Sequence, residues 1–204
     1  MSRSATQRHG LLGGSFDPVH LAHVSLARHA LQHLKLDTVT LIPAAQPWQR
    51  EALGADPAQR LDMLKIATAD EPGLKISPVE VERGGPTYTI DTVRELPADH
   101  QFYWILGADQ LENFCTWKDW QDIVARVHLA VAARPGAALH PPAALQDELA
   151  RLGRKLDVIP MAPIDLSATE IRERLASGQN VDGMLHPGVA QYIQRHGLYR
   201  PSAA

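Results

Sequence analysis

One stretch near the N-terminus constrains the fold of this chain most. A short apolar run at 10–12 is followed by two glycines at 13–14, by Ser-Phe-Asp-Pro at 15–18, and then by His20 and His23. We predict a strand that ends at the glycines, a tight turn, and a helix over about 21–34. Residues three apart are neighbours on a helix, so both imidazoles should share one face.

A glycine-ended strand that leads into a helix is a typical place for a phosphate group. Glycine lets a ligand approach the backbone, and a helix N-terminus offers unpaired N–H groups to an anion. A bare H-x-x-H pair is more often two ordinary histidines, so the preceding glycines carry this prediction. We expect Asp17 to be structural, with its carboxylate in an Asx turn rather than on a metal.

The rest of the chain alternates apolar runs with segments of helical periodicity. This alternation predicts an α/β fold, namely a Rossmann-like, mainly parallel sheet with helices on both faces. Pro78 should place its strand at an edge or a bulge. The later strands are expected over 38–42, 74–81, 102–106, 128–132 and 156–159, and 43–55 is expected to be a loop.

Two helix starts are marked by their sequences. Asp56-Pro57-Ala58-Gln59 reads as an N-cap, an N1 proline and a capping-box glutamine. Ser167-Ala168-Thr169-Glu170 reads as a second capping box, with Arg172 in the first turns of its helix and Gly178 at its end. Further helices are expected from residue 89 to about 96, around residue 111, and over 120–125, 143–152 and 187–196.

Composition narrows the class of partner. The 204 residues suit one domain, which we expect to span 1–204, and a net charge of −3 without a basic run argues against nucleic acid and membrane surfaces. The lone Cys115 cannot form an internal disulfide, and residues 1–8 lack the apolar segment of a signal peptide, so we expect a cytoplasmic protein. We expect a small-molecule partner; whether the chain forms a homo-oligomer stays open.

Two common nucleotide cradles are absent from the sequence: neither G-x-G-x-x-G nor G-x-x-x-x-G-K-[ST] occurs. The glycine turn with His20-Leu21-Ala22-His23 instead resembles the H-x-G-H signature of the nucleotidyltransferase superfamily, with Ala22 where glycine is usual. Over essentially its whole length the chain is similar to bacterial nicotinate-nucleotide adenylyltransferases. The motifs behind this likeness are Gly-Gly-Ser-Phe-Asp-Pro at 13–18, Pro-Thr-Tyr-Thr-Ile-Asp-Thr at 86–92, Gly-Ala-Asp at 107–109, Trp117, Arg-Pro-Gly at 134–136, S-x-T-x-x-R at 167–172 and Gly-Leu-Tyr at 197–199.

The resemblance implies the nucleotidyltransferase fold and transfer of the adenylyl group of ATP to nicotinate mononucleotide. The products would be deamido-NAD and pyrophosphate, in NAD biosynthesis. Two alternatives stay open: another acceptor, either nicotinamide mononucleotide or phosphopantetheine, and a non-catalytic nucleotide-binding module. Trp117 and the run at 87–92 disfavour phosphopantetheine, whereas intact His20, His23 and Arg172 disfavour the binding module.

The resemblance also implies roles for individual residues. His20, His23 and Arg172 would be catalytic, and the helical part from about 167 to 204 would complete the ATP site. A magnesium ion (Mg2+) would be held mainly by ATP phosphates, with no protein metal site. The loop that follows the second strand departs from the family's usual Pro-Pro-His pattern, with Pro47-Trp48-Gln49-Arg50. ATP would contact Gly13, Gly14, Ser15, Phe16, His20, His23, Gly107, Asp109, Ser167, Thr169 and Arg172, and nicotinate mononucleotide would contact Arg50, Thr87, Tyr88, Thr89, Trp117 and Arg134.

Overall fold

A parallel sheet of six strands organises the described part of the chain. The computed structural model describes residues 6–47, 53–162 and 164–200. Within these ranges the strand order is β4-β2-β1-β6-β7-β8, and each neighbouring pair is parallel, which confirms the predicted α/β fold. The strands are β1 (Arg8–Gly14), β2 (Thr38–Pro43), β4 (Leu74–Ile76), β6 (Gln101–Gly107), β7 (His128–Ala133) and β8 (Asp157–Pro160).

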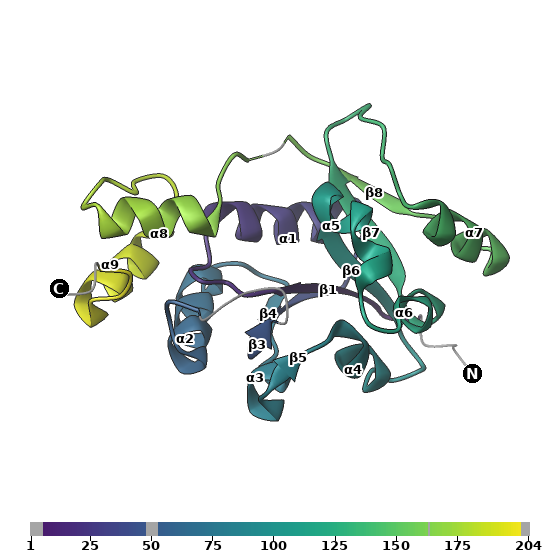
Figure 1. Ribbon diagram of the computed structural model, residues 1–204, viewed down its shortest axis with the longest axis horizontal. Helices are drawn as coiled ribbons and strands as arrows, with labels where there is room; N and C mark the ends of the chain where they lie inside the picture. The colour runs from purple at the N-terminus through teal and green to yellow at the C-terminus, as the bar shows by residue number, and fades with distance from the viewer. Residues whose placement is uncertain (1–5, 48–52, 163, 201–204) are drawn as a thin grey trace.

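Helices cover both faces of this sheet, as Figure 1 shows with α1 above β1 and α4 below it. Side chains alternate along the central strands, so Leu11 and Leu12 of β1 enter different hydrophobic clusters. One cluster packs the sheet against α1, α2 and α9, and the other packs it against α4, α6 and α7. The helices are α1 (Leu21–His33), α2 (Pro57–Thr68), α3 (Val79–Arg83), α4 (Thr89–Arg94), α5 (Ala108–Glu112), the 3-10 turn η1 (Phe114–Thr116), α6 (Trp120–Arg126), α7 (Ala143–Arg151), α8 (Ala168–Ala176) and α9 (Pro187–His196).

The strand predicted over 74–81 is wrong beyond Ile76. β4 is a short edge strand, as Pro78 indicated, but the chain then turns into helix α3 at Val79. Proline cannot donate to a strand ladder, so pairing ends before it. The segment predicted as a loop over 43–55 also contains β3 (Gln46–Pro47), which pairs in parallel with β5 (Pro86–Thr87).

The two predicted capping boxes differ in outcome. Asp56 accepts from the N–H of Gln59 at 2.8 Å, and the Gln59 side chain accepts from the N–H of Asp56 at 3.0 Å, so this box is complete. Ser167 accepts from the N–H of Glu170 at 3.1 Å, but the Glu170 side chain bonds Arg174 instead of the N–H of Ser167.

None of the helices in the described ranges is long and apolar enough to cross a bilayer.

Candidate active site

The two histidines of the signature lie together at the start of α1. His20 is the N-cap residue, and its ring stacks on that of His23 with 3.7 Å between centroids. The backbone N–H of His20 donates to Nδ1 of His23 at 3.3 Å. Both imidazoles therefore occupy the helix N-terminus, where an anion is favoured.

His20 is the more deeply buried of the pair, with only 6% of its surface exposed. Burial lowers its pKa to about 4, because a charged imidazole loses solvation there. Its Nδ1 atom has no hydrogen-bond partner among the described residues. Before a ligand binds, His20 is therefore neutral at pH 7 and has one ring nitrogen available for a hydrogen bond.

The glycines of the signature are required by packing inside the protein. A Cβ atom on Gly13 would lie 2.8 Å from the indole of Trp104, and one on Gly14 would lie 3.2 Å from the ring of Phe16. Phe16 has a φ of 48° and is buried, with its ring 4.9 Å from that of His23. The sides that a Cβ would occupy at Gly13 and Gly14 are thus filled by two aromatic rings, and approach of a ligand to the backbone of these glycines stays a prediction.

Asp17 is structural, as expected, but its bonds are not those of an Asx turn. The buried carboxylate of Asp17 accepts from the N–H groups of Gly54 and Ala55, at 2.8 and 3.0 Å, and from the hydroxyl of Tyr199 at 2.7 Å. Its backbone carbonyl accepts from Nη1 of Arg172 at 2.8 Å. Distant segments, rather than neighbouring residues, thus hold the turn in place.

Arg172 joins α8 to this turn. Besides its bond to Asp17, its guanidinium contacts Oγ1 of Thr169 at 3.2 Å. Ser167 and Thr169 are both exposed at the start of α8, and Ser167 acts as the N-cap. The structure therefore brings the predicted basic helix start to the histidine-bearing turn, across 155 residues of sequence.

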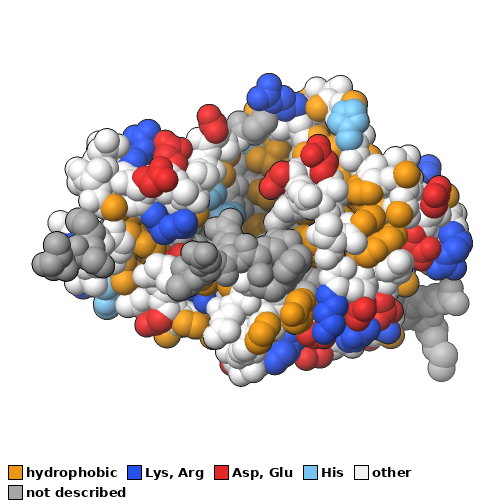
Figure 2. All heavy atoms as spheres, viewed as in Figure 1, with side chains coloured by type: hydrophobic (Ala, Val, Ile, Leu, Met, Phe, Trp, Pro, Cys, Tyr) orange, Lys and Arg blue, Asp and Glu red, His pale blue; other side chains and the backbone are white. Residues whose placement is uncertain are grey.

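A cavity of about 490 Å³ adjoins the first turns of α1. Figure 2 shows a hollow on this face of the molecule, with hydrophobic side chains inside it and histidine at its margin. Ala22, Gly107 and Asp109 line the cavity, and so does the exposed Arg134. Asp109 lies in the first turn of α5, where Gly107 is the N-cap residue. Gly107 and Asp109, predicted for ATP, thus share one cavity with Arg134, predicted for the acceptor.

The residues predicted for the pyridine ring come from two adjoining segments. Thr87 in β5 accepts from the N–H groups of Ala45 and Gln46, at 3.0 and 3.3 Å, so its hydroxyl also holds the two short strands together. Tyr88 caps α4, and Nζ of Lys118, next to Trp117, lies 4.5 Å from its ring centroid.

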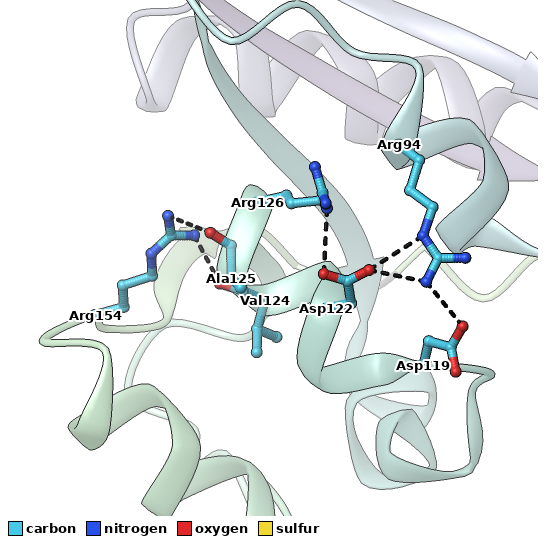
Figure 3. Close-up of polar contacts among 7 residues, drawn as sticks. All are labelled: Arg94, Asp119, Asp122, Val124, Ala125, Arg126 and Arg154. Atoms are coloured by element: carbon cyan, nitrogen blue, oxygen red, sulfur yellow. Dashed lines mark hydrogen bonds and ion pairs between the residues drawn. The ribbon is translucent and has the colours of Figure 1, made fainter.

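An ion-pair network fixes these two segments relative to each other. Arg94 on α4 bonds Asp119 at 3.0 Å and Asp122 at 2.9 Å, and both carboxylates belong to the start of α6 (Figure 3). Trp117 is half-buried against Phe114, with ring centroids 5.0 Å apart. Thr89 is half-buried at the start of α4. Arg50, also predicted here, lies outside the described residues.

Comparison with known proteins decides the family. The sequence model of the cytidylyltransferase-like family matches residues 11–174. A Bordetella pertussis protein named "Probable nicotinate-nucleotide adenylyltransferase" is 60% identical over 193 residues, covering 95% of this chain and 98% of that protein. The chain belongs to the nicotinate-nucleotide adenylyltransferase family. A relative of the same name from Chromobacterium violaceum is 43% identical, covering 95% of this chain and 99% of its own.

Solved structures agree with this adenylyltransferase fold. The Plasmodium falciparum nicotinic acid mononucleotide adenylyltransferase complexed with NaAD superimposes with a TM-score of 0.76 and 18% identity, covering 95% of this chain and 97% of that one. Its complex with APC gives a TM-score of 0.72 and 19% identity, with the same coverage. At such identities the likeness concerns the fold alone.

Two buried charged residues and one half-buried tyrosine were not singled out as functional from the sequence. Arg60 is completely buried, and Glu80 is bonded by the hydroxyl of Thr92 at 2.6 Å. The hydroxyl of Tyr199, a residue named from the sequence only within the 197–199 motif, donates to Asp17. The one sequence signal for a role of Arg60 was its charge on an otherwise apolar helix face. Its hydrogen-bond partners are backbone carbonyls, and no sequence pattern predicts which carbonyls these are.

The described residues include no cluster of three or more His, Cys, Asp or Glu side chains that could hold a metal. Asp17 supplies the carboxylate of the signature turn itself, and this carboxylate already accepts hydrogen bonds from two N–H groups and a tyrosine hydroxyl. Mg2+ prefers water and phosphate oxygens as ligands, so a divalent ion that arrives bound to a nucleotide would need no cluster of protein carboxylates here.

Proposed function

We propose that the protein transfers the adenylyl group of ATP to nicotinate mononucleotide, forming deamido-NAD and pyrophosphate in NAD biosynthesis. A relative that is 60% identical over 95% of this chain is named "Probable nicotinate-nucleotide adenylyltransferase". The structural observation that carries the proposal is the pair of stacked imidazoles at the N-terminus of α1, beside a cavity of about 490 Å³. That volume is typical of a small-molecule site.

The reaction joins two anions, so positioning and charge stabilisation should dominate catalysis. A phosphate oxygen of the mononucleotide attacks the α-phosphorus of ATP in line, and the bond from that phosphorus to the bridging oxygen breaks to release pyrophosphate. No covalent enzyme intermediate is needed. Mg2+ bound to the ATP phosphates would neutralise part of their charge.

His20 and His23 are proposed to act on the transferring phosphate. The buried His20 is neutral before ligands bind, so it can donate a hydrogen bond from a ring N–H. An arriving phosphate would raise its pKa, because an opposite charge favours the protonated ring. Arg172, with Ser167 and Thr169, is proposed to hold the outer ATP phosphates and the leaving pyrophosphate.

The cavity is proposed to bind the nucleoside part of ATP, with Asp109 accepting from ribose hydroxyls. Arg134 lines the same cavity as Asp109, which favours a role for Arg134 in binding ATP. The resemblance had implied that Arg134 binds the phosphate of the mononucleotide instead. Trp117, with Tyr88 and Thr89, is proposed to receive the pyridine ring and its carboxylate. A cytoplasmic location stays a prediction.

Pyrophosphate release tests the proposal. The assay uses ATP and Mg2+ with nicotinate mononucleotide, nicotinamide mononucleotide or phosphopantetheine as parallel acceptors. A strong preference for nicotinate mononucleotide, lost on chelation with EDTA and restored by Mg2+, is expected. Preference for another acceptor would remove the role given to Trp117 and Thr89, and ATP binding without turnover would favour a non-catalytic module.

A further inference from the structure

Arg60 is a buried guanidinium that contacts backbone from two loops. It lies on α2 with 0% of its surface exposed. Its Nη1 donates to the carbonyl oxygens of Ser15 and Ala44, at 2.8 and 2.6 Å, and its Nη2 donates to that of Ala45 at 3.1 Å. Burial lowers the pKa of Arg60, and the nearby Asp17 carboxylate opposes that shift.

The two loops belong to different halves of the site. Ser15 lies in the signature turn, one residue before Phe16 and five before His20. Ala44 and Ala45 follow β2 and lead into β3, and the N–H of Ala45 donates to Thr87 in β5. A continuous set of hydrogen bonds therefore runs from the signature turn, through Arg60, to Thr87, which directly precedes Tyr88 and Thr89.

The shape of the guanidinium suits this bridge. It is planar and offers several N–H donors in a fixed arrangement, whereas a lysine ammonium is a point charge on a flexible stem. In the described part of the chain no carboxylate forms an ion pair with Arg60. Its direct partners are neutral carbonyls, so its contribution is to their placement.

We propose that Arg60 is a positioning residue that fixes the separation between the ATP half and the acceptor half of the site. This inference rests on the proposed function, because that separation matters only when two nucleotides react with each other. In-line transfer is sensitive to such geometry: a displacement of about 1 Å can lower a rate by about 10²-fold.

The test compares wild type with Arg60→Lys in four measurements on folded protein. Isothermal titration gives the Kd of ATP alone and of nicotinate mononucleotide alone, then that of deamido-NAD, and pyrophosphate release gives kcat. Each single nucleotide occupies one half, so its Kd should change by less than about threefold, while kcat should fall about 10- to 100-fold. Deamido-NAD must span both halves, and its Kd should rise about tenfold.

Arg154 provides a matched control on the far side of the sheet. Its guanidinium also donates to three backbone carbonyls at the end of α6, those of Val124 and Ala125, which Figure 3 draws, and that of Val127. These contacts adjoin neither the signature turn nor β3. Arg154→Lys should lower the melting temperature and leave kcat and the Kd of deamido-NAD unchanged.

Each outcome decides the point. An unchanged kcat in Arg60→Lys, or an equal weakening of all three ligands, would overturn the positioning role. If Arg60→Lys does not fold, Arg60→Gln replaces it, since the amide lacks the buried charge. Failure of both variants to fold, while Arg154→Lys folds, would assign Arg60 to stability alone. Lack of turnover in wild type itself would refute the proposed function, whereas a Kd of deamido-NAD that does not rise in Arg60→Lys relative to wild type would refute the positioning role.

Discussion

The hydroxyl of Tyr199 donates to Oδ1 of Asp17 at 2.7 Å, across 182 residues of sequence. Asp17 is 1% exposed, and the other hydrogen bonds to its carboxylate come from the N–H groups of Gly54 and Ala55. Burial and the adjacent carboxylate raise the pKa of Tyr199 far above its usual range, so its hydroxyl stays a donor. This contact ties the end of the chain to the turn that carries the histidines.

Tyr199→Phe should lower the free energy of unfolding by about 1.5–3 kcal/mol, because a buried carboxylate loses one donor. Urea denaturation measures this change. Tyr192→Phe is the control, since that hydroxyl contacts the partly exposed Asp62 at the longer distance of 3.4 Å and should matter by less than about 0.5 kcal/mol. Equal effects of the two substitutions would contradict a special role for the Asp17 contact.

His23→Ala should reduce kcat by about 10²- to 10³-fold, the usual cost of losing one preorganised donor to a developing charge. The loss is measured by pyrophosphate release under saturating ATP and mononucleotide. His33→Ala, at the exposed last turn of the same helix, controls for changes to α1 itself. Near-normal turnover of His23→Ala would remove this residue from catalysis.

Glu80 should make stability depend on pH. Burial raises its pKa to about 7, against the opposing hydrogen bond from Thr92 and the charge of Arg83. The folded state therefore holds this proton more tightly than the unfolded state, so the contribution is complete below about pH 4.5 and is lost as pH rises through 7. Glu80→Gln should remove this dependence and raise stability at pH 8 relative to wild type.

Thermal or urea unfolding between pH 4.5 and 8 checks this prediction. Glu95→Gln is the control, because the carboxylate of Glu95 also pairs with Arg83 but is exposed to solvent. The free energy of unfolding of wild type should fall more steeply with pH over this range than that of Glu80→Gln. Equal slopes for the two proteins would refute the prediction.

Gly107→Ala should raise the KM for ATP through Asp109. A Cβ atom at Gly107 would lie 2.6 Å from Oδ1 of Asp109, so the carboxylate must move away from its place in the cavity. We expect about a tenfold rise, the usual effect of a lost hydrogen bond that involves a charged group. In the background of Asp109→Ala the same change should add little, and a double-mutant cycle measures this coupling. Additive effects would show that Gly107 acts independently.

Local patterns predicted much of the fold. The apolar run at 102–106 predicted strand β6, and Asp56 to Gln59 formed the capping box that their spacing indicated. Pro78 was placed near a sheet edge, but the helix after it was missed. The pairing of Gln46–Pro47 with Pro86–Thr87 was also missed, because two-residue strands leave no periodic pattern.

The sequence by itself determined which chemical groups this protein carries: the histidine pair after a glycine-ended strand, and a helix start with Ser167 and Arg172. These are local, because spacing along one helix or turn fixes which side chains are neighbours. Tertiary structure decided how the groups are held. Asp17 is held by Gly54, Ala55 and Tyr199, and Arg60 binds backbone carbonyls of two loops. Such contacts join segments far apart in the chain, and a backbone carbonyl or N–H looks the same in every residue, so only the folded chain identifies the partners.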